Sequence, residues 1–140
     1  MGAGRAREQG NVVAKWLSVE WFDEARSMAA DQPGYPGLTG GIQVEITGGP
    51  DGERSYYEVL EDGRPAGAAP GRIEDPEVTV TLGWDDAVAV HRGHLDPNVA
   101  FMQGRMKVAG RMAVVLALLA VSGTPERRRL RRRIAAVTDY

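Results

Sequence analysis

Hydrophobic and polar residues alternate in two stretches near the middle of the chain. Ile42, Val44 and Ile46 are separated by polar side chains, and residues 78–82 repeat the alternation with threonines between aliphatic positions. A period of two residues predicts a β-strand that buries one face and exposes the other. We therefore expect half-buried strands at residues 42–47 and 78–82.

Turn signals place further strands around these two. The Gly-Gly-Pro-Asp-Gly run at residues 48–52 predicts a hairpin that leads into a strand at residues 54–60. An Asp-Gly turn follows, and residues 64–72 give a weak third strand, which their two prolines place at an edge of the sheet. A last strand is expected at residues 105–109, directly after Gly104.

Residues that cap helices stand before segments with helical spacing. Ser18 is a suitable N-cap for one helix, and Asp96 caps another that has Pro97 at its first position. A short helix is expected at residues 84–92, where Gly93 ends it. Locally paired strands with helices among them predict an α+β fold, in which helices pack on one face of a mainly antiparallel sheet.

The most unusual pattern is the run at residues 112–121, in which every side chain is apolar. A helix without a polar face is expected to be buried on all sides or to line an internal cavity. The run is bounded by Arg111 and by Ser122 and Gly123, so it is shorter than the roughly 20 apolar residues that span a bilayer. No transmembrane segment is therefore expected.

One block of residues carries a family signature. It consists of Asp96, Pro97, Ala100, Phe101, Met102, Gly104, Lys107, Gly110 and Met112. The block closely resembles the signature of the sterol carrier protein type 2 domain family, and the resemblance continues through residues 78–82 and weakly to Trp16. It implies a lipid carrier without a cofactor rather than an enzyme, built on a five-stranded sheet whose helices enclose an apolar cavity.

Given this resemblance, one apolar set is the candidate lining of the ligand pocket. Its members are Trp84, Val88, Phe101, Met102, Met106, Met112, Val115, Leu116 and Leu119. Flexible methionine side chains suit a surface that repacks around varied ligands. Without the resemblance, the same set would be interpreted as a filled core. Tyr56 and Tyr57 are further candidates to close the space, or else pack in the ordinary way.

Length and composition favour a single domain with short additions. A chain of 140 residues suits one hydrophobic core. We expect a disordered leader at residues 1–12, a lipid-binding domain at residues 13–123 and a basic C-terminal helix at residues 124–140. The chain has no cysteine and its first residues lack an apolar signal core, so a cytoplasmic location is expected. The excess of arginine over lysine is typical of a GC-rich bacterial genome.

The basic residues are concentrated at the C-terminus. Residues 124–140 hold six arginines against Glu126 and Asp139, whereas the chain as a whole has a net charge of −2. Leu130, Ile134 and Val137 fall at helical spacing, and the arginines are expected to face outward. Candidates for contact with an anionic surface are Arg127, Arg128, Arg131 and Arg132. An acidic body makes nucleic acid an unlikely partner, and a solvated helix without function is the simpler alternative.

No arrangement of residues indicates catalysis. His91 and His94 would need a third ligand to bind a metal, with Asp96 or Asp85 the nearest candidates. His91 shares a helical face with Trp84, so a histidine at the edge of the core or pocket is the preferred interpretation. The serines lack a nucleophile context, and the glycines lack a phosphate-binding one.

The hypothesis is therefore non-catalytic binding of a sterol-like, fatty acyl or other apolar lipid in an internal tunnel. Intracellular transfer of that lipid and transient contact with an anionic membrane are secondary expectations. The alternative is an interaction module with a filled core, whose Arg-rich tail binds a protein, a membrane or a nucleic acid. A third hypothesis, an isomerase-like enzyme that uses His91 or a tyrosine beside the pocket, lacks a visible proton-transfer geometry.

Overall fold

A computed structural model describes residues 13–140, and the leader predicted at residues 1–12 lies outside them. The strands are β1 (Ala14–Lys15), β2 (Gly40–Gly49), β3 (Gly52–Glu61), β4 (Arg64–Pro70), β5 (Val78–Gly83), β6 (Met106–Gly110) and β7 (Thr138–Asp139). The helices are α2 (Val19–Met28), α3 (Trp84–Arg92), α4 (Pro97–Met102), α5 (Met112–Ser122) and α6 (Pro125–Ala135). The predicted α+β class is confirmed.

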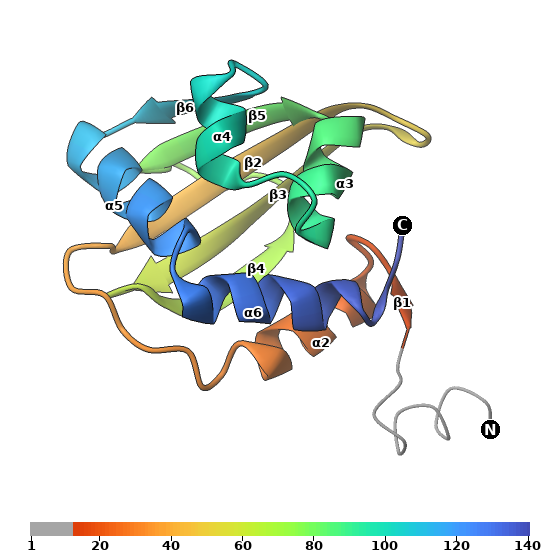
Figure 1. The fold of residues 1–140 in the computed structure, drawn as a ribbon, viewed down its shortest axis with the longest axis horizontal. Helices are drawn as coiled ribbons and strands as arrows, with labels where there is room; N and C mark the ends of the chain where they lie inside the picture. The colour runs from red at the N-terminus through yellow and green to blue at the C-terminus, as the bar shows by residue number, and fades with distance from the viewer. Residues whose placement is uncertain (1–12) are drawn as a thin grey trace.

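Five strands form one sheet in the order β4-β3-β2-β5-β6 (Figure 1). Three of its four pairings are antiparallel, as predicted, while the central pair β2 and β5 is parallel, so the sheet is mixed. The parallel pair arises because the β3–β4 hairpin folds to one side of β2 and the chain then returns to its other side. The proline-containing strand β4 is at an edge, as expected.

The helices lie on one face of the sheet, which Figure 1 shows from the helical side. Alternation along the strands directs Ile42, Val44 and Ile46 toward this face, where all three are buried. In the antiparallel register, Val44 stands beside Tyr56 of β3. The inner face of the sheet and the helices above it therefore enclose the core.

Side chains cap three of the helices, two of them at the capping residues predicted above from the sequence. The Ser18 hydroxyl accepts from the Trp21 amide at 3.2 Å, and the Asp96 carboxylate accepts from the Asn98 amide at 2.8 Å. The Thr124 hydroxyl accepts from the amide of Arg127 at the start of α6. These bonds satisfy amides that have no partner inside the helix, which fixes where each helix begins.

A short pairing joins the two ends of the described chain. Strand β1 runs parallel to β7, and the Trp16 amide donates to the Asp139 carbonyl at 2.8 Å. Neither strand is evident from the sequence, because two-residue strands carry no periodic pattern. The pairing holds buried Trp16 against α3, where its ring lies 5.0 Å from that of Trp84.

Of the two settings predicted for residues 112–121, burial on all sides is wrong, whereas Leu118 and Leu119 do line the pocket described below. Helix α5 buries Val115 and Leu119, whereas Met112 is 65% exposed and Leu116 is 60% exposed. The helices form a single layer, so α5 contacts β6, α4 and α6 with one side and presents the other to solvent. Composition could not distinguish the two sides, because both are apolar.

Candidate ligand-binding pocket

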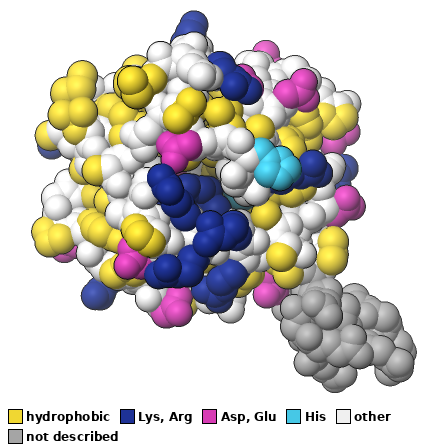
Figure 2. Space-filling model, in the orientation of Figure 1, with side chains coloured by type: hydrophobic (Ala, Val, Ile, Leu, Met, Phe, Trp, Pro, Cys, Tyr) yellow, Lys and Arg dark blue, Asp and Glu magenta, His cyan; other side chains and the backbone are white. Residues whose placement is uncertain are grey.

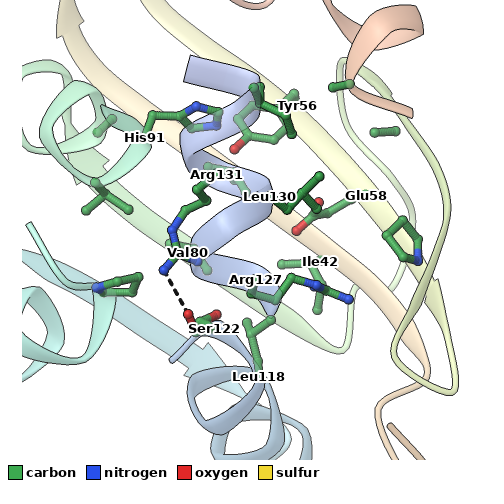
Figure 3. A pocket seen from close by; sticks show the side chains of 18 of the residues that line it. Ile42, Tyr56, Glu58, Val80, His91, Leu118, Ser122, Arg127, Leu130 and Arg131 are labelled. Atoms are coloured by element: carbon green, nitrogen blue, oxygen red, sulfur yellow. Dashed lines mark hydrogen bonds between the residues drawn. The ribbon is translucent and has the colours of Figure 1, made fainter. Parts of the chain in front are cut away.

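A pocket of about 250 Å³ lies between the inner face of the sheet and the helices (Figure 3). Its floor consists of strand side chains, among them Ile42, Val44, Ile46, Val80, Leu82 and Val108. Its roof consists of helical side chains, among them Trp21, Phe22, Ala87, Val90, Leu118, Leu130 and Ile134. Strands and helices far apart in the sequence therefore build one largely apolar space.

Two of the predicted pocket residues line this space. Met106 projects from β6 and Leu119 from α5. Val115 is buried beside them but is not part of the lining. Trp84 and Val88 are half-buried on α3, where Trp84 packs against Trp16 instead.

The other four predicted residues lie on the outer surface of α4 and α5. Phe101 and Met102 belong to α4, and Met102 is 84% exposed. Met112 and Leu116 belong to the solvent-facing side of α5. The structure therefore gathers this part of the apolar set on the surface and not around the pocket.

The pocket also holds polar side chains. The sequence singles out Tyr56 and His91 as candidates near the pocket and Arg127 and Arg131 as surface residues, but it does not single out Glu58. The group comprises Arg26 of α2, Tyr56 and Glu58 of β3, His91 of α3, Ser122 of α5, and Arg127 and Arg131 of α6. The register of β3 is a signal that could have found Glu58. Tyr56, Glu58 and buried Leu60 alternate, so a carboxyl group is on the same inward face as a core leucine.

Glu58 and Arg127 form the end of the pocket near β4. Burial raises the pKa of Glu58, and the nearby positive charge of Arg127 opposes this rise. Burial likewise lowers the pKa of Arg127, against the field of Glu58. The Arg127 guanidinium donates to the Gln32 side chain at 3.1 Å and to the Gly63 carbonyl, so protein acceptors already hold it.

The expectation that the basic residues of this helix all face outward is wrong for Arg127 and Arg131. Both line the pocket, because they follow the helical spacing of the buried residues Leu130 and Ile134. The Arg131 guanidinium donates to the Ser122 carbonyl at 2.8 Å, the bond drawn in Figure 3. Burial and the neighbouring arginines lower the pKa of Arg131.

The outer side of α6 matches the expectation. Arg128 and Arg132 are exposed there, and Arg128 pairs with Asp96 at 3.1 Å. Figure 2 shows basic side chains gathered over α6 in the middle of the helical face. A positively charged surface therefore lies directly above the pocket.

His91 lies at the pocket wall, in an aromatic environment. Its ring centroid is 5.0 Å from that of Trp16 and 5.3 Å from that of Trp21, and its Nδ1 is 3.4 Å from the Tyr140 hydroxyl. Burial, with a smaller contribution from Arg131, lowers the pKa of His91 to about 4. The imidazole is therefore neutral at pH 7, as expected for a histidine at the edge of the core.

Within residues 13–140, no group of three histidine, aspartate or glutamate side chains is arranged to hold a metal ion. No helix in this part of the chain is long and apolar enough to cross a bilayer.

A small α+β domain with a largely apolar pocket beneath its helices defines a candidate carrier of apolar ligands. The sequence profile of the SCP-2 sterol transfer family matches residues 24–121. The chain belongs to this family, which confirms the resemblance seen in the sequence.

Individual relatives agree with this assignment. Sterol carrier protein 2 of Rattus norvegicus is 27% identical over 92 residues, which are 65% of this chain and 17% of the rat protein. The chain thus spans about a fifth or less of the curated relatives' length. A crystal structure of sterol carrier protein 2 has the same fold, with a TM-score of 0.68 at 16% identity, covering 88% of this chain and 99% of that one.

The palmitated form of SCP2L2 from Aedes aegypti is also similar. Its solution structure matches with a TM-score of 0.59 and 27% identity, over 77% of this chain and 96% of that one.

Proposed function

We propose that this domain binds an apolar lipid without covalent change and carries it between lipid surfaces. The observation that supports this function is the pocket, whose floor and roof are mainly aliphatic and aromatic. Removing hydrocarbon from water stabilises such a complex by about 0.8 kcal/mol per buried methylene group. Because this contribution is non-directional, it favours ligands by size and not by detailed shape.

The volume of the pocket favours a slender ligand. At about 250 Å³ it is larger than the roughly 150 Å³ cavity that accepts benzene, and it is near the lower limit of about 300 Å³ for drug-sized ligands. An acyl chain therefore fits more readily than a sterol ring system. The palmitated relative makes a fatty acyl chain the first ligand to test.

Transfer requires contact with a lipid surface, and we assign this role to the helical face. Exposed Met102, Met112 and Leu116 are apolar, and exposed Arg128 and Arg132 are basic. Basic residues near an anionic bilayer each contribute about 1 kcal/mol to binding. A chain without cysteine suits a reducing compartment, so we place this activity in the cytoplasm.

An unfilled pocket favours the carrier over the alternative of an interaction module with a filled core. The isomerase-like hypothesis gains no support from the geometry, since the His91 ring lies against the Tyr140 hydroxyl and not against a group placed for proton transfer to a ligand.

Displacement of a fluorescent fatty acid by unlabelled palmitate tests the carrier function. Met106→Trp should weaken binding because a larger side chain fills part of the pocket. Leu119→Phe should weaken binding less, because it adds less volume. Met102→Trp is the matched control, since Met102 is 84% exposed outside the pocket. Absence of saturable binding by the wild type, or equal effects of Met106→Trp and Met102→Trp, would contradict the proposal.

A further inference from the structure

Arg131 differs from Arg127 and Arg128 of α6 in how its charge is compensated. Arg128 has a carboxylate partner, Asp96, at 3.1 Å. Arg127 bonds to Gln32 and Gly63 and lies in the field of Glu58. Arg131 lines the pocket and donates to a single neutral acceptor, the Ser122 carbonyl.

The guanidinium of Arg131 retains capacity to bind a ligand. A guanidinium carries five N–H donors, and one hydrogen bond of Arg131 is identified. Within residues 13–140, no carboxylate lies within 4.0 Å of its nitrogen atoms; Asp96 acts on it only at longer range. A planar guanidinium with unused donors matches the geometry of a carboxylate or a phosphate group.

The electrostatic surroundings favour an anion at this position. Burial is the largest influence that opposes the positive charge of Arg131, and Arg128, Arg127 and Arg132 oppose it further, whereas the more distant Asp96 favours it. A buried cation is costly unless it is paired. The counter-charge within the pocket is Glu58, and burial raises the pKa of that carboxyl group. An anionic ligand would therefore relieve an unfavourable arrangement.

Neutral polar side chains line the same pocket. Figure 3 shows the Tyr56 and His91 side chains near the turn of α6 from which Arg131 projects, while the Arg131 guanidinium extends from there toward Ser122. Tyr56 and His91 both line the pocket, and the raised pKa of Tyr56 keeps its hydroxyl protonated at pH 7. A hydroxyl and a neutral imidazole can donate hydrogen bonds to an oxyanion without adding charge.

We propose that Arg131 is a specificity-determining residue, which makes the pocket select a single-chain amphiphile with an anionic head group, a carboxylate above all, over a neutral lipid of the same length. The chain would lie along the apolar floor formed by residues such as Val44 and Val80, with the head group at α6. This inference rests on the proposed function, because it assumes that the pocket holds a lipid.

Titration calorimetry with laurate and with 1-dodecanol tests the inference, since the two ligands share a chain and differ in head group. The wild type should bind laurate at least about 10-fold more tightly, the effect of one charge-assisted hydrogen-bonding contact. Arg131→Gln should remove this preference and leave dodecanol affinity within about 2-fold. Arg133→Gln, at an exposed position of the same helix, is the matched control and should leave both affinities unchanged.

Two further measurements distinguish a loss of the Arg131 contact from misfolding of the Arg131→Gln variant. Arg131→Lys keeps a positive charge and should keep part of the preference for laurate even if it binds less tightly overall. The NMR titration of His91 should move upward in pH in folded Arg131→Gln, because the arginine charge that lowers its pKa is gone.

Each negative outcome of these binding measurements contradicts a different claim. Equal affinity of the wild type for laurate and dodecanol, or equal loss of both in Arg131→Gln, would overturn the role of Arg131 while the carrier function stands. Displacement of laurate by acetate or inorganic phosphate at similar concentrations would identify a site for free anions and would overturn the amphiphile. No binding of either ligand would overturn the carrier function itself.

Discussion

Lowering the pH from 7 to 5 should destabilise the fold through His91. The imidazole lies against Trp16 and Trp21, and its pKa is lowered to about 4 from an ordinary 6.5. Between these two values the unfolded chain binds a proton that the folded protein excludes. His91 therefore leaves the free energy of unfolding unchanged above pH 6.5. As the pH falls toward 4, this free energy decreases, because only the unfolded chain binds the proton.

The magnitude follows from the gap between the two pKa values. One pH unit corresponds to 1.36 kcal/mol, so complete protonation costs about 3 kcal/mol, and the part between pH 7 and pH 5 is roughly 2 kcal/mol. This is a large fraction of the 5–15 kcal/mol typical of domains. Urea unfolding at pH 7, 6 and 5, followed by tryptophan fluorescence, measures the change directly.

The controls separate His91 from other titrating groups. His91→Gln should remove the loss, whereas His94→Gln should keep it, because His94 is exposed. Glu58 acts with the opposite sign, since a raised folded pKa stabilises the fold as the pH falls, but it is present in all of these proteins and cancels from the comparison. If the wild type and His91→Gln lose equal stability between pH 7 and pH 5, the assignment of a buried neutral imidazole is refuted.

Three further predictions concern the framework of the fold, each checked by urea unfolding. Gly110→Ala should lower the free energy of unfolding by at least about 2 kcal/mol, because Gly110 has a φ of +143° and an added Cβ would lie 2.1 Å from the Glu77 carbonyl oxygen. An unchanged free energy of unfolding would contradict this backbone conformation at the end of β6. Leu130→Ala should cost about 2–5 kcal/mol, since Leu130 is 6% exposed; a smaller loss would mean that α6 is a detachable tail. Leu116→Arg should change stability by less than about 0.5 kcal/mol, because Leu116 is 60% exposed; severe destabilisation would place α5 inside the core.

Local interactions explain what the sequence determined by itself. Ser18, Asp96 and Thr124 cap their helices because capping joins residues only two or three positions apart. The alternation at residues 42–47 and 78–82 predicted two strands because successive side chains of a strand point to opposite faces. The family block could also be recognised, because its residue types all lie within one short segment, residues 96–112.

Only the tertiary structure decided which apolar and basic residues face the pocket. Helix α5 is apolar on every side, so its pattern contains no information about the side that contacts β6. Glu58 and Arg131 are 73 positions apart, and the packing of α6 over the sheet brings both to one pocket. Where both faces of a helix have the same pattern, only tertiary packing determines which face is buried, because burial depends on what the rest of the chain places against each face.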